Sequence, residues 1–313
     1  MKILAVSPHI HSGVTTQKLM RNVLIALLPA LLAAFIFWRW MAFCLVLTCI
    51  LSAVLAELLA IKIFKKKNTI NNLSAVVTGV LLAFCLPPGL PLWMAAFGAF
   101  FAIFIVKELF GGLGYNIFNP ALSGRALLLA SYPTFMTTWL SPYDALTSAT
   151  PLDIAKVGGF ISITSASTQS APLAVAVPYW DMFLGTISGA LGETSTLALL
   201  IGAVYLLCCK VIDWRIPLGY LGTVAVFMFV MGQNVLFHLL AGGLILGAFF
   251  MATDYTTSPM SRRGKLIFAI GCGILTAVIR LWGGSAEGTC YAILVMNMFV
   301  PLIDRLNEAK NKA

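Results

Sequence analysis

The side chains best suited to covalent chemistry are the hydroxyls of the run 144–150, DALTSAT. The run lies in 133–177, the longest segment without a helical pattern, between apolar stretches. A threonine hydroxyl offered to water there, Thr150 above all, is a place where a prosthetic group could be attached. Such an attachment would indicate a redox protein, whereas a plain loop would favour an ordinary transporter.

Thr150 has a second interpretation, as the N-cap of a short helix. Pro151 would then take the first helical position and Asp153 the third, which is a common way for a helix to begin. A cap does not explain Asp144 or the small residues 147–149, which leave the hydroxyl accessible to a modifying enzyme. The residues alone leave both interpretations open.

A second polar constellation spans residues 107–121, KELFGGLGYNIFNPA. Its three glycines permit positive φ or close backbone approach. Asn116 and Asn119 offer amide groups at the start of an interrupted helix, and Arg125 follows inside that helix. A buried arginine is costly unless it is paired or faces a polar ligand. The constellation is either a cofactor pocket or a re-entrant turn with a structural arginine.

A third polar run, 254–263, places Asp254 and Thr257 before Pro259. These groups could cap the next helix, or they could bind an anion or a polar substituent of a flavin ring. Three carboxylates also lie in or near apolar stretches: Glu57, Glu193 and Glu287. Such carboxylates favour ion pathways, although a bond to a neighbouring helix is an equally good interpretation.

The amino-acid composition indicates which kind of secondary structure must position these groups. The chain has 313 residues, of which 60% are hydrophobic and 10% charged, and its mean hydropathy is +0.96. Soluble domains carry about 25% charged residues, so the sequence predicts an all-α polytopic membrane protein. The first apolar stretch, from Arg21, has no cleavage site and is interpreted as a retained span.

The net charge of +9 does not indicate a nucleic-acid partner, because the basic residues flank apolar stretches, where membrane topology explains them. The seven cysteines form no Cys-x-x-Cys pair, and the spacing of the three histidines suggests no metal site. We interpret the cysteines as small buried hydrophobes. A cluster shared with a second protein is the alternative.

Ten apolar runs are candidates to cross a bilayer, for which about 20 residues are needed. They lie near 21–38, 41–61, 72–86, 91–107, 118–132, 193–209, 216–232, 235–252, 265–281 and 288–303. The third ends in Leu-Pro-Pro-Gly, and the fifth begins at Asn119. Interrupted spans survive in lipid only where their free backbone groups face protein or a polar cavity. We therefore expect a polar site in the core.

The charges orient these spans. Arg39, Lys156 and Arg280 fall on one face and Arg125 inside a span, while the remaining Lys and Arg of the 20 fall on the face of the termini. This bias predicts cytoplasmic termini. The segment 133–177, with Thr150, is then expected on the outer face.

The chain is predicted to consist of two halves of five spans each. Each half has a Gly-Gly pair, at 111–112 and 242–243, and a polar run with proline, at 116–120 and 254–259. Two related halves are common in transport folds. The predicted units are the N-terminal half 1–132, the extracytoplasmic region 133–192 with the attachment site, and the C-terminal half 193–313.

Taken together, these residues resemble a known family. The sequence is similar to the D subunits of the Rnf electron transport complex, which are related to the B subunits of the sodium-translocating NADH:quinone oxidoreductase. The resemblance covers almost the whole chain, in the segments 7–9 (SPH), 111–121, 144–150, 192–195 (GETS), 251–259 and 287–288. From the residues alone, segment 7–9 is either an ordered surface arm or a docking site for a soluble partner.

The resemblance implies that a flavin transferase joins FMN to the Thr150 hydroxyl through a phosphoester bond. Ser148 stands where related proteins often have glycine, and its small size should not prevent the modification. A second, non-covalent flavin, riboflavin, is also implied. The residues that we expect to line a flavin or ion site are Asn116, Asn119, Arg125, Asp254 and Thr257.

The function implied is electron transfer between ferredoxin and NAD partners, coupled to translocation of Na⁺ or H⁺ across the bacterial inner membrane. The expected partners are membrane lipid and the other Rnf subunits: the flavin-bearing G subunit, the small A and E membrane subunits, and the B and C iron–sulfur subunits. The related fold is similar to that of urea transporters. A channel or transporter for a small polar solute is thus the main alternative, and a structural scaffold is another.

Overall fold

A computed structural model describes residues 15–66, 69–142, 146–157, 179–193, 195–284 and 287–312. The arm 7–9 and Asp144 lie outside these residues. Within them the chain is helical, and its only β-type pairing is an isolated bridge between Leu140 and Thr147. This agrees with the all-α prediction.

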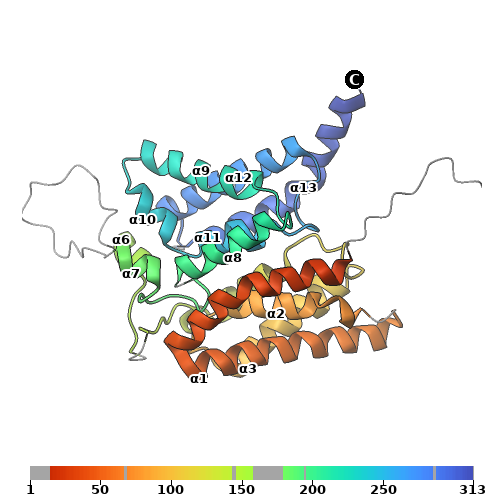
Figure 1. Ribbon diagram of the computed structural model, residues 1–313, viewed down its shortest axis with the longest axis horizontal. Coiled ribbons are helices and arrows are strands. Elements are labelled where there is room, and N and C mark those ends of the chain that lie inside the picture. Colours follow the sequence, from red (N-terminus) through yellow and green to blue (C-terminus); the bar gives the residue numbers. More distant parts are fainter. Residues whose placement is uncertain are drawn as a thin grey trace, which may run out of the picture.

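The first element, α1 (Thr16–Phe64), is a long helix with a sharp bend at Arg39, whose φ is 46° and ψ −118°. The bend folds the two limbs into a hairpin, visible in red and orange in Figure 1. The predicted spans 21–38 and 41–61 correspond to these two limbs. A run of buried alanines lets neighbouring helices approach α1 closely.

The next helices pack on this hairpin. They are the short η1 (Ile70–Asn72), α2 (Ser74–Phe84), α3 (Leu92–Phe101), its π-helical continuation η2 (Ala102–Glu108), and α4 (Pro120–Ser131). A Cβ atom added at Gly79 of α2 would lie 2.9 Å from the Cα of Ile50. Glycine there lets α2 contact the α1 backbone directly.

Short helices occupy the middle of the chain: α5 (Pro133–Met136), α6 (Pro151–Val157) and α7 (Tyr179–Leu184). The later helices are α8 (Thr196–Cys208), α9 (Arg215–Val230), α10 (Val235–Leu240), α11 (Leu244–Leu246), the π-helical η3 (Gly247–Met251), α12 (Arg262–Trp282) and α13 (Thr289–Lys312). The predicted span 235–252 is interrupted between α10 and α11, because Gly242 and Gly243 adopt φ values of 72° and 61°. Helix η3 continues α11 directly.

Within the described part of the chain, three helical stretches are long and apolar enough to cross a membrane: Thr16–Phe64, Arg262–Trp282 and Thr289–Leu306. Helices α2, α8 and α9 are apolar but shorter. With the family evidence given below, these helices indicate a multi-pass membrane protein.

Helix α8 joins two groups of helices. Figure 1 shows α1–α3 on one side, α9 and α12 on the other, and α8 with α11 between them. Helix α8 packs on α1 so closely that a Cβ atom at Gly202 would lie 2.0 Å from the carbonyl oxygen of Ala26. Helix α12 packs on α9, where the buried hydroxyls of Tyr220 and Thr276 are 2.6 Å apart.

Candidate functional site

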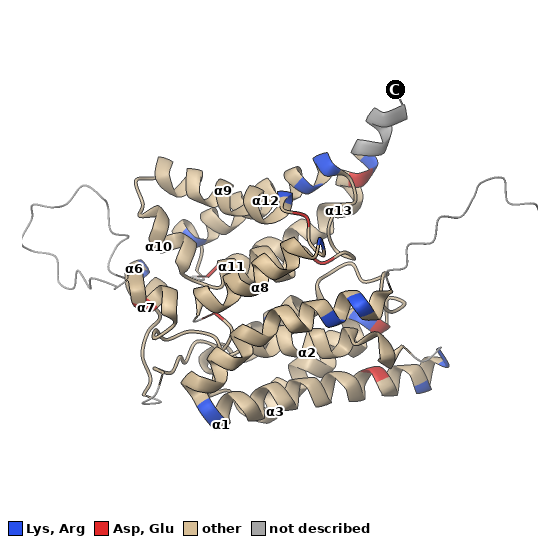
Figure 2. Ribbon diagram, viewed as in Figure 1, with Lys and Arg blue, Asp and Glu red and all other residues tan. Residues whose placement is uncertain are grey.

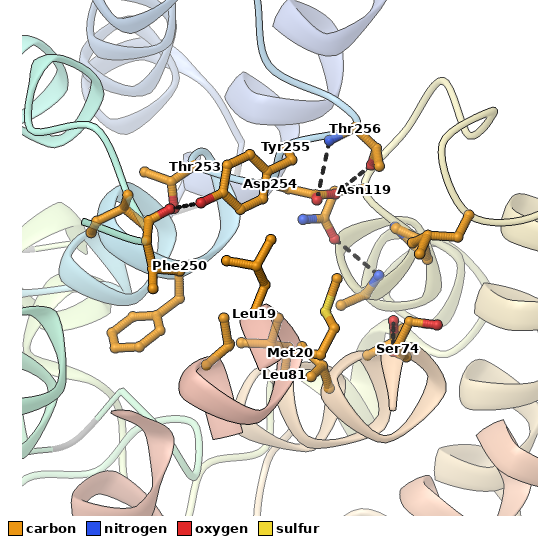
Figure 3. Close-up of a pocket in the computed structure, with 18 of the residues that line it drawn as sticks. Leu19, Met20, Ser74, Leu81, Asn119, Phe250, Thr253, Asp254, Tyr255 and Thr256 are labelled. Carbon is orange, nitrogen blue, oxygen red and sulfur yellow. Dashed lines mark hydrogen bonds between the residues drawn. The ribbon is translucent and has the colours of Figure 1, made fainter. Parts of the chain in front are cut away.

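A cavity that we call the central cavity lies where α1, α2 and α8 meet two loops, 109–119 and 252–261. Its empty volume is about 780 Å³, including its open mouth. Apolar side chains form most of its walls, among them Leu19, Met20, Val23, Leu81, Leu206, Phe249 and Phe250. Figure 3 shows the labelled apolar residues Leu19, Met20, Leu81 and Phe250 around the cavity, with Asn119 and Asp254 on its polar side.

The polar side brings together two constellations that are far apart in sequence. Asn116 donates its side-chain Nδ2 to Thr256 Oγ1 at 3.0 Å, and Asn119 donates to the carbonyl of Met251 at 3.2 Å. Asn119 also caps α4 through its side-chain oxygen. Asn116, Asn119 and Asp254 all line the cavity. The first loop follows the π-helix η2 and the second follows the π-helix η3.

Asp254 is a half-buried carboxylate held by neutral donors. It accepts from the Thr256 hydroxyl at 3.0 Å, from the Thr257 hydroxyl at 3.4 Å and from the Thr256 backbone N–H. Among the described residues no Lys or Arg forms a salt bridge with it. Burial raises the pKa of Asp254, and the hydrogen bonds from Thr256 and Thr257 offset only part of that rise. The cavity therefore offers an acceptor that favours a ligand with N–H groups.

Thr257 lies behind the cavity wall, 2% exposed. It contacts Asn297 of α13, a residue that was not among the predicted site residues. With the Asn297 amide oriented by its hydrogen bonds, its nitrogen donates to Thr257 O at 3.0 Å and its oxygen accepts from Asn119 N at 3.1 Å. The sequence signal that could have identified Asn297 is a single asparagine within an apolar span.

Lys107 also lines the cavity, and it too was not predicted as a site residue. Its ammonium donates to Glu57 Oε1 at 2.9 Å and to Ser74 Oγ at 2.8 Å. A second lysine, Lys66, pairs with Glu108 at 3.0 Å. Glu57 is thus bonded to a neighbouring helix, which is one of its two sequence interpretations.

Arg125 lies away from this cavity. It forms an ion pair with Glu287, in the loop before α13. Glu287 and Glu193 line a second cavity of about 330 Å³, together with Thr150 and Gly242. The structure therefore separates Arg125 from Asn116 and Asn119, with which the sequence grouped it.

The expectation that Thr150 is offered to water is wrong. Thr150 is only 6% exposed. Its hydroxyl donates to Asp153 Oδ2 at 2.7 Å and accepts from the Asp153 backbone N–H at 3.1 Å, so it caps α6. The physical reason is that Leu152 and Ala155 of α6 pack into a small apolar cluster, which draws the start of the helix inward.

Known proteins match this chain along nearly its whole length. The sequence model of the NQR2, RnfD, RnfE family matches residues 3–312. The chain is 48% identical over 309 residues to the D subunit of the Na⁺-translocating ferredoxin:NAD⁺ oxidoreductase complex of Acetobacterium woodii, covering 97% of this chain and 93% of the relative. It is 44% identical to the D subunit of the proton-translocating complex of Clostridium ljungdahlii, covering 96% and 93%. The D subunit of an ion-translocating oxidoreductase complex of Stutzerimonas stutzeri is 40% identical, covering 93% and 90%.

Proposed function

This chain belongs to the NQR2, RnfD, RnfE family, and from that premise we propose that it is the D subunit of an ion-translocating ferredoxin:NAD⁺ oxidoreductase complex. The observation that carries the proposal is similarity along nearly the full length of subunits with that name. The chain acts as an enzyme only within the complex. Its part is to pass electrons between redox partners while the complex moves Na⁺ or H⁺.

The membrane arrangement consists of ten spans in two five-helix halves, divided as 1–132, 133–192 and 193–313. Two features support it. Every predicted span overlaps described helix, and the polar loops after η2 and η3 reach one cavity from the two halves. Figure 2 shows Lys and Arg gathered at the end of the molecule where α1 begins and ends and α12 begins. Cytoplasmic termini, and an outer face bearing Thr150, follow from that asymmetry.

The central cavity is the place for a non-covalent flavin such as riboflavin. Its apolar walls suit a flat tricyclic ring, while the Asn116 and Asn119 amides and the Asp254 carboxylate suit the polar edge of that ring. A flavin supplies reversible electron transfer when bound. The residues of this chain would bind the ring, orient it and exclude water from it.

Thr150 is the attachment point for FMN, joined by a flavin transferase on the outer side. Its hydroxyl is the right chemical group for a phosphoester. The cavity of about 330 Å³ around it has little free room, so α6 must shift to accommodate the cofactor. The partners within the complex are the A, B, C, E and G subunits.

The test is flavin fluorescence of the denatured, gel-resolved protein, produced together with the transferase. We expect the wild-type band to fluoresce and the Thr150→Ala band to be dark, because the ester oxygen is missing. Thr138→Ala, which removes an exposed hydroxyl outside the run 144–150, is the matched control and should stay bright. A dark wild-type band, with a transferase that labels the G subunit, would contradict the attachment and favour a solute transporter.

A further inference from the structure

The start of α6 pairs a hydroxyl with a carboxylate. In a capping box the side chain at the third helical position accepts from the backbone N–H of the capping residue. Here the Asp153 carboxylate accepts from the Thr150 hydroxyl itself, at 2.7 Å. A hydroxyl and an acceptor base within 2.6–3.2 Å are the geometry of an activated nucleophile.

We propose that Asp153 is the general base for the attachment of flavin to Thr150, an inference that rests on the proposed function. Thr150 Oγ1 forms a bond to the flavin-side phosphorus of a flavin dinucleotide, which is a phosphoanhydride. The anhydride P–O bond breaks, and its electron pair leaves with the nucleoside monophosphate. The hydroxyl proton passes to Asp153 Oδ2 and then to water, and nothing is oxidised or reduced.

Thr150 and Asp153 can become accessible to a transferase together, because both move with α6. Thr150 and Asp153 are three residues apart, and Asp153 belongs to a seven-residue helix that Thr150 caps, so their contact does not depend on where α6 is docked. Docking rests on the small cluster of Leu152, Ala155, Met182, Phe237 and Ala241. Releasing α6 from that cluster exposes the hydroxyl and its base together.

The surroundings of the docked helix favour reaction in the released state. Glu193 and Glu287 line the cavity at Thr150, which has little free room for a flavin dinucleotide, and Glu287 is paired with Arg125. The hydrogen bonds of the Thr150 hydroxyl run instead to the carboxylate and the backbone N–H of Asp153. Asp153 is therefore the base that accompanies the nucleophile.

The experiment uses the full-length protein, purified without its transferase and then mixed with purified transferase and flavin dinucleotide. The initial rate of covalent flavin incorporation is measured by in-gel fluorescence. General-base catalysis contributes about 100-fold or more, so Asp153→Asn should lower the initial rate by about that factor. Asp153→Glu should recover most of it. Asp181→Asn is the matched control, because Asp181 likewise accepts from a nearby hydroxyl, Thr186, at 2.9 Å.

Thermal melting distinguishes a role of Asp153 as a general base from a role in capping α6. If Asp153 is a general base, the Asp153→Asn protein should incorporate flavin slowly and keep the wild-type melting temperature. The Asp153→Ala protein should also incorporate flavin slowly, and added acetate should partly restore its rate. Asp153→Asn labelled at the wild-type rate, or an Asp153→Ala rate that acetate does not raise, overturns the inference while leaving Thr150 as the attachment site. A wild-type chain that takes up no flavin, beside a G subunit that does, overturns the proposed function as well.

Discussion

At the residue scale, the ion pair of Lys107 and Glu57 holds two charges where water has little access, with side chains 3% and 1% exposed. Breaking such a pair from one side leaves an uncompensated buried charge, which costs much more than the intact pair contributes. Ser74 and Thr69 complete the network, at 2.8 Å from Lys107 and 2.7 Å from Glu57. The network fixes the end of η2 beside the central cavity.

Lys107→Met should therefore lower the free energy of unfolding by about 3–5 kcal/mol. Adding Glu57→Gln should restore much of the loss, because no buried charge then remains unpaired. The measurement is thermal melting in detergent. Lys265→Met is the control, since its partner Asp213 is partly exposed and the loss should be about 0–1 kcal/mol. Equal losses for the single and double variants would show that the pair is not coupled.

At the element scale, the contact of α8 with α1 depends on a missing side chain. The Gly202 Cα faces the Ala26 carbonyl, and an added Cβ atom would lie 2.0 Å from that oxygen. Backbone cannot yield as a flexible side chain can, so the two helices would have to separate. This close approach holds α8 between α1 and the helices that follow it.

Gly202→Ala should destabilise the protein by about 1–3 kcal/mol through overpacking. Gly222→Ala is the matched control within α9, because an added Cβ atom there meets nothing within 4 Å. Alanine improves helix propensity, so this control should be neutral or stabilising by up to about 1 kcal/mol. Similar melting temperatures for the two variants would argue against the close packing of α8 on α1.

At the scale of the whole molecule, the two ends differ in charge and carry different loops. Cys208 and Cys209 are exposed at the end of α8, next to basic residues. Met231 is 42% exposed at the other end of the following helix, α9. These positions allow the orientation to be measured directly.

A membrane-impermeant maleimide should label Cys208 and Cys209 in inverted vesicles but not in intact spheroplasts. With both replaced by serine, Met231→Cys should show the opposite pattern. The physical reason is the retention of Lys and Arg on the cytoplasmic side. Labelling of the native pair from outside would reverse the orientation and place Thr150 in the cytoplasm.

Much of the helical layout could be predicted from hydropathy, because a bilayer demands long apolar runs. Asn116, Asn119 and Asp254 were predicted to line a flavin or ion site. The sequence contains no distances, so it could not show that they line the same cavity. The burial of Thr150 was missed, because it depends on Leu152 and Ala155 finding apolar partners from α7 and α10. Asn297 and Lys107 were missed for the same reason: their roles come from neighbours that lie far along the chain.

The separation of the Thr150 cavity from the central cavity has an electrical consequence. The central cavity includes the first turns of α1, and Figure 1 places α6 at the opposite end of the molecule from the beginning of that helix. An electron exchanged between flavins at these two places would move along the membrane normal. Work of about 2.3 kcal/mol accompanies each elementary charge that crosses 100 mV. Transfer within this single chain would thus be voltage-dependent, slowed or driven by the field that the complex itself builds.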